Sequence, residues 1–478
     1  MDRRTRIAAA LLLLYALTTV GLAVLDYDVA AREGYFPSEG AELRYIEWTP
    51  RRGATRGTVV LYHGFGGSSE MMSWLGVEFA RNGYRAVAYD NRGHGKSSSR
   101  LNYSLVVLLA DLEALREELQ LGGEGLVLVG HSMGGMAVQS LAESGLPVQA
   151  LVVVASRSRQ TAPAPRSLLV LAGLDEIFSP RGLDLGALQG WEVFISPWDD
   201  HLTVLYSPGA IQAVLEWVLG VAPRNLSQQR LALALVRSAA ALALLALIPA
   251  YTASRSSRLP RGGRWLHLLL AVPLASAAAP LLYPVLAATT SAPVAAYVLA
   301  VLYAQSIGVL LASWRRLGYA RELVQVLTPR ALASSLLTAG LAYALVHEAL
   351  QPFMNVELSA HRAGTAALLF ALSLAPALVF EAYARPLLIE TSWARALARA
   401  LALRSLGFAA AWLATLAALG GGGFAGYLLI VTMMSLVLLL PIDAAATSWL
   451  SKPSTPAGST LWVSLLLAAL LASVTPIT

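Results

Sequence analysis

Apolar residues follow two different patterns along the chain. Between about residues 36 and 222, short apolar runs alternate with mixed segments, which is typical of the strands and helices of a globular domain. Beyond residue 230, long runs rich in Ala and Leu are separated by arginines and prolines, which predicts helices that cross a membrane. An uncharged run of 19 residues, Ile7–Leu25, precedes both parts. The pattern predicts a membrane anchor within residues 1–30, a globular domain at 36–222 and a polytopic membrane domain at 230–478.

Strands and helices alternate in the globular part. The apolar runs predict strands at 41–49, 58–62, 85–89, 126–129, 148–154, 167–171 and 192–195, and the mixed segments predict helices at 70–82, 103–119, 136–142 and 208–219. Strands that alternate with helices at this spacing form a parallel sheet with helices on both faces. The predicted fold class is therefore α/β, with a doubly wound sheet.

The membrane part contains about eight apolar stretches that predict transmembrane helices. They lie at about 231–251, 266–288, 294–314, 331–353, 365–389, 406–420, 424–440 and 460–475, and the segments 316–327 and 393–404 are candidates for interfacial helices. Arginines gather before Ile7 and in the connections 252–264, 315–330 and 390–405, whereas the connections 289–293, 354–364 and 421–423 contain only Arg362. Because Lys and Arg favour the cytoplasmic side, we expect a multi-pass membrane protein whose globular domain is extracytoplasmic.

A cleaved signal peptide is the alternative interpretation of the first apolar run. Val29-Ala30-Ala31 resembles a processing site. The run is long for a signal peptide, however, and the site lies beyond the charged Asp26 and Asp28. An uncleaved anchor is therefore favoured.

Charge and cysteine content narrow the classes of function. The net charge is +6, but all the basic residues except Lys96 and Lys452 are arginines, many of which separate apolar runs. Membrane topology explains them better than nucleic-acid binding does, so no nucleic-acid partner is expected. The absence of cysteine excludes disulfides, thiolate catalysis and Cys-ligated metals, and we expect no cofactor.

Few ionisable residues lie in or near the predicted spans, and Arg237 is one of them. Glu381 and Arg385 are four residues apart near a predicted cytoplasmic end, which favours an ion pair. His347 and Glu348 lie near an outer end, where they either line a cavity or are solvated. These groups predict neither a metal site nor a proton relay.

The sequence Gly130-His131-Ser132-Met133-Gly134 lies between a predicted strand and a predicted helix. In this context G-x-S-x-G presents a serine alone on a sharp turn, and the glycines let the neighbouring backbone come close. Ser132 is therefore the candidate nucleophile. An incidental serine in a glycine-rich turn is the alternative.

A second glycine-rich loop, His63–Gly67, directly follows the strand at 58–62. Backbone N–H groups in such a loop can point into a pocket and stabilise an oxyanion. The predicted donors are the backbone N–H groups of Phe65 and of Met133, the residue after the candidate nucleophile. Otherwise the loop only leads to a helix capped by Ser68 or Ser69.

Three motifs together resemble the α/β-hydrolase superfamily, and most closely its monoacylglycerol-lipase and serine-aminopeptidase-like branch. They are His63-Gly64-Phe65-Gly66, Asp90-x-Arg92-Gly93-x-Gly95-x-Ser97 and Gly130-His131-Ser132-Met133-Gly134-Gly135. The resemblance covers about residues 40–220 and implies the α/β-hydrolase fold with its serine-based chemistry. It says little about the substrate, because this fold hosts many activities. We interpret the polar residues of the Asp90–Ser97 loop as structural, and we reject His94 as a base because it precedes the nucleophile.

In this fold an acid and then a histidine follow the nucleophile along the chain. Asp175 follows the strand at 167–171, and His201 is the only histidine between the nucleophile motif and the membrane part. We expect His201 to take the proton of Ser132 and Asp175 to orient the imidazole. Asp184, Asp199 and Asp200 are rivals for the acid, and Asp175 is preferred because it alone directly follows a strand.

Many relatives insert a lid between the strands at 148–154 and 167–171, but here only residues 155–166 are available. We expect a site with a minimal or absent lid, covered by the membrane or the membrane part, and an amphiphilic or lipid ester as substrate. The first candidate is an esterase, lipase or lysophospholipase that acts through an acyl-serine. A serine peptidase of the same fold is the second candidate, and a transporter or scaffold with an accessory hydrolase domain is the third.

Overall fold

The computed structural model describes residues 3–122, 126–252, 265–313, 329–384, 388, 393–419, 423–451 and 456–478. The chain forms two compact units. The sheet unit comprises Ala16–Arg237, Leu350–His361 and Pro476–Thr478, and the helical unit comprises Met1–Tyr15, Ser238–Ala349 and Arg362–Thr475. The sheet unit therefore includes a short segment that lies more than 100 residues beyond its main part.

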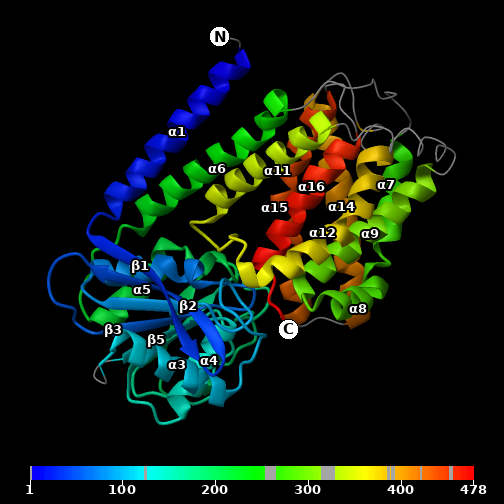
Figure 1. The fold of residues 1–478 in the computed structure, drawn as a ribbon. Helices are drawn as coiled ribbons and strands as arrows, with labels where there is room; N and C mark the ends of the chain where they lie inside the picture. Colours follow the sequence, from blue (N-terminus) through cyan, green and yellow to red (C-terminus); the bar gives the residue numbers. More distant parts are fainter. Residues whose placement is uncertain are drawn as a thin grey trace. The chain divides into compact units, whose positions relative to one another are not determined.

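A β-sheet forms the centre of the sheet unit (Figure 1). It has eight strands in the order β1-β2-β4-β3-β5-β6-β7-β8. The strands are β1 (Val29–Ser38), β2 (Ala41–Pro50), β3 (Thr58–Tyr62), β4 (Arg85–Tyr89), β5 (Leu126–His131), β6 (Val148–Val154), β7 (Ser167–Ala172) and β8 (Trp191–Ser196). From β4 to β8 every neighbouring pair is parallel, as predicted. The pairs β1–β2 and β2–β4 are antiparallel, so the sheet as a whole is mixed, with its antiparallel strands at one edge.

The strand β1 is absent from the sequence-based prediction, which interpreted part of it as a possible processing site. Only Val29, Phe36 and Ser38 of its ten residues are buried, so its apolar alternation is weak. An edge strand that pairs on one side only can carry such a polar sequence. Its hydrogen bonds to β2 hold it in the sheet.

Helices pack on both faces of this sheet (Figure 1). They are α2 (Ser73–Arg81), α3 (Leu105–Leu119), α4 (Met133–Glu143) and α5 (Pro208–Leu219), and the short 3-10 turns are η1 (Ser69–Met72), η2 (Leu185–Ala187) and η3 (Thr203–Leu205). On one face, Leu112 of α3 and Val138 of α4 pack against sheet residues such as Leu128 in one apolar core. Each fully buried side chain of this size contributes about 1.5–3 kcal/mol. This core holds the carboxyl ends of the central strands in place.

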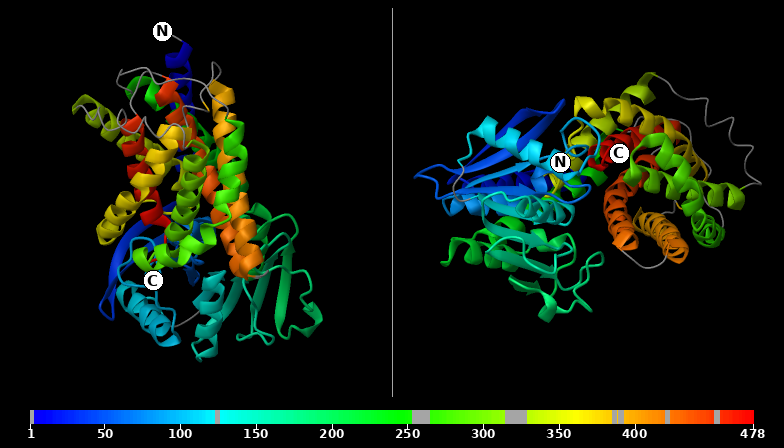
Figure 2. Two further views of the ribbon diagram at one scale, coloured as in Figure 1. Left: turned by 90° about the vertical axis from the view of Figure 1, so that its right-hand side faces the viewer. Right: turned by 90° about the horizontal axis from the view of Figure 1, so that it is seen from below.

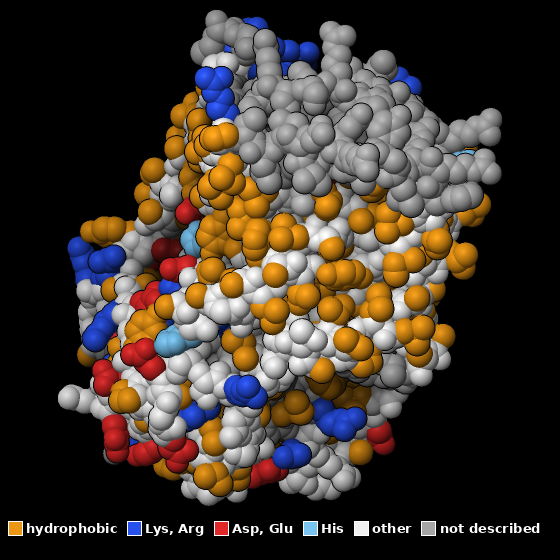
Figure 3. All heavy atoms as spheres, turned by 45° about the vertical axis from the view of Figure 1, so that its right-hand side comes forward, with side chains coloured by type: hydrophobic (Ala, Val, Ile, Leu, Met, Phe, Trp, Pro, Cys, Tyr) orange, Lys and Arg blue, Asp and Glu red, His pale blue; other side chains and the backbone are white. Residues whose placement is uncertain are grey.

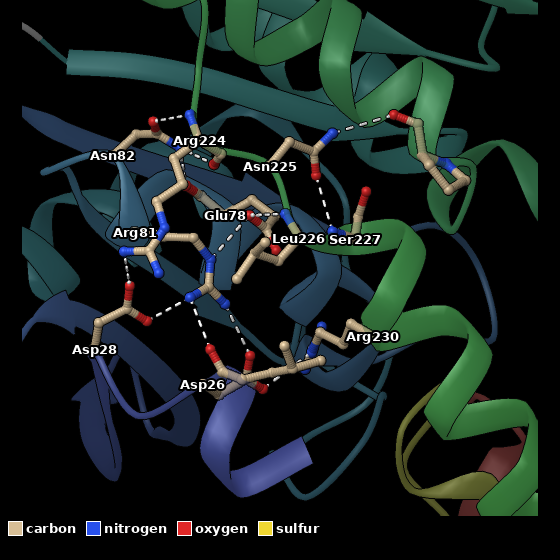
Figure 4. A network of polar contacts seen from close by, with 12 residues as sticks. Asp26, Asp28, Glu78, Arg81, Asn82, Arg224, Asn225, Leu226, Ser227 and Arg230 are labelled. Atoms are coloured by element: carbon tan, nitrogen blue, oxygen red, sulfur yellow. Dashed lines mark hydrogen bonds and ion pairs between the residues drawn. The ribbon is translucent and has the colours of Figure 1, made fainter. Parts of the chain in front are cut away.

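Two long helices begin or end at the sheet unit, α1 (Arg3–Leu25) and α6 (Ser227–Thr252). Arg81 of α2 forms ion pairs with Asp26 and Asp28, just after α1, and with Glu78 (Figure 4). Arg230 in the first turns of α6 pairs with the other oxygen of Asp26 at 3.1 Å. This network therefore ties the end of α1 and the start of α6 to the same helix of the sheet unit.

The helical unit contains further long helices (Figure 2). They are α7 (Leu266–Ser276), α8 (Ala279–Thr290), α9 (Pro293–Ser313), α11 (Pro329–Leu350), α12 (Ala363–Val379), α14 (Trp393–Leu419), α15 (Gly423–Ser451) and α16 (Pro456–Val474), with a π-helical turn η6 (Phe380–Ala384) and a 3-10 turn η5 (Ala360–Arg362). Hydrophobic side chains cover much of the visible surface of this unit (Figure 3). Within the described ranges, five helices are long and apolar enough to cross a membrane, or six if α7 and α8, bent by 59°, form one span.

Some predicted spans differ from the helices of the structure. The predicted interfacial helix 393–404 and the predicted span 406–420 are one continuous helix, α14. The predicted spans 424–440 and 460–475 fall on the helices α15 and α16. The predicted interfacial segment 316–327 lies outside the described residues.

The polar residues of the helical unit are only partly described. Arg385 lies outside the described residues, so the predicted ion pair with Glu381 stays a prediction. Glu381 accepts a hydrogen bond from Ser459 Oγ at 2.5 Å. His347 Nδ1 lies 3.6 Å from a carboxylate oxygen of Glu348. Glu381 is therefore held by a serine of α16.

Candidate active site

Ser132 occupies a sharp turn between β5 and α4. Its backbone has φ 55° and ψ −118°, a conformation that a residue with a Cβ adopts only under strain. The neighbouring glycines make this turn possible: a Cβ at Gly134 would lie 2.2 Å from the carbonyl oxygen of Tyr62, and one at Gly130 would lie 2.2 Å from that of Gly134. Strand, turn and helix therefore meet as the G-x-S-x-G motif predicts.

The three residues that the sequence analysis selected lie in one hydrogen-bonded chain. His201 Nε2 is 2.9 Å from Ser132 Oγ. His201 Nδ1 is 3.0 Å from Asp175 Oδ2 and 3.1 Å from Oδ1. Their exposed fractions are 8% for Ser132 and 3% for each of the other two. In this geometry an imidazole can accept the serine proton while the carboxylate stabilises the imidazolium that forms.

The surroundings of Asp175 favour the ionised form of its side chain. Burial by itself would raise its pKa, but the hydrogen bond and the charge of His201 lower it. The backbone N–H groups of Ile177 and Phe178 donate to Asp175 Oδ1 at 2.8 and 2.7 Å, and they lower the pKa further. The net result is a pKa below the ordinary value for Asp, so the side chain is ionised near neutral pH.

The three rival carboxylates make other contacts. Asp199 accepts a hydrogen bond from Ser196 Oγ, and Asp200 accepts hydrogen bonds from the backbone N–H groups of Leu202 and Thr203. Asp184 accepts one from the N–H of Gly186 and caps η2. These bonds are local, whereas Asp175 reaches the ring of His201.

The loop His63–Gly67 passes directly beside Ser132. A Cβ at Gly64 would lie 2.9 Å from the Cβ of Ser132, so the close approach requires glycine there. The N–H of Gly67 donates to the carbonyl of Gly64 at 3.0 Å and closes the turn that contains Phe65. Met133 is the first residue of α4, where backbone N–H groups have no acceptor within the helix. Both predicted oxyanion donors therefore lie in segments next to Ser132.

Polar residues behind this loop fix its conformation. His63 Nε2 accepts from the N–H of Asn91 at 3.0 Å, so His63 Nδ1 carries the proton that it donates to the carbonyl of Gly64 at 2.8 Å. Asp90 accepts hydrogen bonds from the N–H of Ser69 and of Lys96. These bonds agree with a structural role for the polar residues of the Asp90–Ser97 loop.

His131 also contacts His201, a relationship that the sequence analysis did not find. Its Nε2–H donates to the carbonyl oxygen of His201 at 2.8 Å, and the two ring centroids are 4.9 Å apart. Burial, followed by the charge of His201, lowers the pKa of His131 to about 3, so its ring is neutral. The only signal in the sequence is its position directly before Ser132.

A cavity of about 380 Å³ lies elsewhere in the sheet unit, and Ser132, Asp175 and His201 are not part of its lining. It is bordered by β1, β2, η1 and α6, with Glu33, Arg44, Trp74 and Arg230 in its walls. We place the candidate site at Ser132 rather than in this cavity, because the reactive geometry lies there. Within the described ranges, no group of three or more His, Asp and Glu residues could hold a metal ion.

Comparison with known proteins agrees with this fold. Residues 57–179 match the family described as "alpha/beta hydrolase fold". A non-heme chloroperoxidase of Streptomyces lividans is 36% identical over 122 residues, 25% of this chain and 42% of the relative. A monoglyceride lipase of Saccharomyces cerevisiae is 33% identical over 106 residues, 20% of this chain and 34% of the relative. A thermophilic esterase of Thermogutta terrifontis aligns in structure with a TM-score of 0.34 and 18% identity, over 40% of this chain and 99% of its own.

The chain spans less than half of the length of the chloroperoxidase and of the lipase. The family match and the strand order confirm that the sheet unit has the α/β-hydrolase fold, as the resemblance predicted.

Proposed function

We propose that this protein is a membrane-bound serine hydrolase that cleaves carboxylic esters of amphiphilic or lipid molecules through an acyl-Ser132 intermediate. The observation that carries the proposal is the 2.9 Å separation of His201 Nε2 and Ser132 Oγ, continued by the bond from His201 Nδ1 to Asp175. A serine hydroxyl becomes an effective nucleophile when a positioned base can take its proton.

The first half of the reaction forms the acyl-enzyme. His201 Nε2 takes the proton of Ser132 Oγ as this oxygen bonds to the ester carbonyl carbon, whose carbonyl oxygen becomes negative. The N–H groups of Phe65 and Met133 stabilise that oxyanion. His201 then gives its proton to the leaving alkoxide, and the acyl group stays on Ser132 as an ester. Asp175 stabilises the imidazolium in between and remains ionised.

The second half releases the acid. His201 takes a proton from a water molecule, the resulting hydroxide attacks the acyl carbon, and the same two N–H groups hold the new oxyanion. The proton returns from His201 to Ser132 Oγ as the acyl bond breaks. Water is the only co-reactant, and the products are an alcohol and a carboxylic acid.

The preference for an amphiphilic substrate rests on the short connection between β6 and β7 and on the apolar helices. The connection 155–166 contains no helix, so no helical lid is inserted at the usual place. Two of the candidate membrane spans, Arg3–Leu25 and Ser227–Ile248, join the sheet unit through the ion pairs around Arg81. A hydrolase tethered in this way works close to a lipid surface, where esters of fatty acids are concentrated. The arginine distribution supports an extracytoplasmic location for it.

The test has two parts. Purified protein is offered matched panels of esters and peptides, and hydrolysis of the esters that is lost in Ser132→Ala supports the proposal. Cleavage of peptides alone would instead favour the serine-peptidase alternative. Intact cells are then labelled with a membrane-impermeant fluorophosphonate. Labelling of the wild type but not of Ser132→Ala supports an extracytoplasmic site, and labelling only after lysis contradicts it.

A further inference from the structure

The sheet unit includes a segment that comes much later in the sequence than the last strand and helix of the hydrolase fold. This returning segment, Leu350–His361, lies between α11 and α12 in the sequence and belongs to the sheet unit. It contributes no strand to the sheet. Several of its contacts reach residues that follow the loop His63–Gly67 or His201 in the sequence.

Phe353 of the returning segment lies in a cluster of three aromatic rings. Its ring stacks on that of Trp74, with centroids 5.7 Å apart and planes inclined by 20°. It meets the ring of Tyr206 edge-on at 5.3 Å, and Trp74 and Tyr206 meet each other at 5.7 Å. Each such pair contributes about 0.5–1.5 kcal/mol beyond the area it buries.

Hydrogen bonds fix the same cluster to the backbone of the returning segment. Trp74 Nε1–H donates to the carbonyl oxygen of Pro352 at 2.8 Å, and Tyr206 O–H donates to that of Phe353 at 3.0 Å. The N–H of Asn355 donates to Ser68 Oγ at 3.1 Å. Trp74 is only 1% exposed, so its side chain is buried where it makes this bond.

The partners of these bonds come from the two sides of the candidate site. Ser68 immediately follows the loop His63–Gly67, which carries the predicted oxyanion donor, and Trp74 is in the first turn of the next helix. Tyr206 ends the short turn η3, which begins two residues after His201. Phe353 therefore connects the segment that follows the oxyanion loop to the segment that follows the base.

We propose that Phe353 is a positioning residue for the hydrolase reaction. It holds the segments after Gly67 and after His201 at a fixed separation, so that the N–H of Phe65 and the Nε2 of His201 stay aligned on Ser132 Oγ. The inference rests on the proposed function. A displacement of about 1 Å at a reacting group lowers a rate by roughly 100-fold, so a residue that prevents it affects the rate without touching the substrate.

The test is the reaction of the purified full-length protein with a fluorophosphonate, followed as a rate and as a final amplitude. The amplitude counts the molecules with a folded site, and the rate reports how well His201 activates Ser132. We expect Phe353→Ala to keep its amplitude and to react about 100-fold more slowly than the wild type. Phe353→Tyr, which keeps the ring, should react within about 3-fold of the wild type. With an ester substrate, Phe353→Ala should lose kcat with little change in KM.

Glu357→Gln is the matched control. Glu357 belongs to the same segment, but its side chain is 54% exposed and its partner is Lys96, so we expect no change of rate.

If Phe353→Ala lowers the amplitude and leaves the rate of the remaining molecules unchanged, the role of Phe353 is only structural and the proposal is wrong. If Phe353→Ala does not fold, Phe353→Leu decides, because it keeps an apolar side chain and removes the ring contacts with Trp74 and Tyr206. The proposal expects a slower rate for Phe353→Leu, and an unchanged rate overturns it. A wild type that does not react at all overturns the proposed function itself, and with it this inference.

Discussion

The Nε2–H of His131 donates a hydrogen bond of 2.8 Å to the backbone carbonyl oxygen of His201, whose ring contacts Ser132. This bond ties the residue before the nucleophile to the backbone of the candidate base. His201 is thus held from two sides, since Asp175 contacts its ring and His131 contacts its main chain. A base fixed in this way needs little reorganisation when it takes a proton.

Replacing His131 should therefore slow the reaction. In His131→Ala the buried carbonyl of His201 loses its donor, which costs about 1–3 kcal/mol of stability. We expect kcat/KM for an ester to fall by about 10- to 100-fold, because His201 becomes less well aligned. His131→Gln keeps an N–H donor and should recover most of the rate. An equal fall of kcat/KM in both variants would show that the hydrogen bond to His201 does not determine the rate.

The same residue should make stability depend on pH. The pKa of His131 is lowered to about 3 in the folded protein, whereas an unfolded histidine titrates near about 6.5. Because the folded pKa is the lower one, the unfolded state binds more protons between these values. The contribution of neutral His131 to the free energy of unfolding is therefore fully present above about pH 6.5. It is lost as the pH falls toward 3, by up to about 1.4 kcal/mol per pH unit.

The measurement is the thermal unfolding temperature of the full-length protein between pH 7 and pH 5, where Asp and Glu side chains are still largely ionised. His131→Gln has no titrating ring, so its unfolding temperature should fall less over this range than that of the wild type. Parallel curves for the two proteins would contradict the assignment of a buried neutral histidine.

Gly134 should tolerate no side chain. A methyl group there would lie 2.2 Å from the carbonyl oxygen of Tyr62, and the backbone on both sides is fixed by the sheet and by α4. We expect Gly134→Ala to lose about 1–3 kcal/mol of stability or more. It should also lose at least about 100-fold in activity, because Ser132 is displaced. Gly122→Ala is the control, since a Cβ there meets nothing within 4 Å. Unfolding and activity assays of both variants check this, and an active Gly134→Ala would contradict the geometry of the turn.

The identity of the acid can be tested with isosteric amides. Asp175→Asn keeps the shape of the side chain but removes the charge that stabilises protonated His201, so we expect kcat to fall by roughly 1,000- to 10,000-fold. Asp184→Asn and Asp200→Asn should each stay within about 3-fold of the wild type, because their bonds are local turns. Steady-state kinetics on one ester substrate distinguish these cases. A large fall of kcat in Asp184→Asn or Asp200→Asn, together with a small fall of kcat in Asp175→Asn, would reassign the acid.

Local patterns were sufficient to predict most elements of the sheet unit. The buried strands β3 to β7 are continuous apolar runs, and the turn at Ser132 has glycines where close backbone contacts require them. The edge strand β1 was missed because its sequence is mostly polar, and the antiparallel direction of β2 depends on pairings that no local pattern contains.

The sequence by itself determined the α/β class and the candidate nucleophile, and its resemblance to the α/β hydrolases implied that an acid and then a histidine follow. The class and the turn at the nucleophile are local patterns, so residue types and spacing are enough to predict them. Only the tertiary structure decided which carboxylate reaches His201, that His131 holds its backbone, and that Phe353 packs between Trp74 and Tyr206. Those contacts join residues that lie 26 to 279 positions apart in the chain. The folding of the sheet and the return of a late segment bring them together, and no local preference of the backbone encodes such distances.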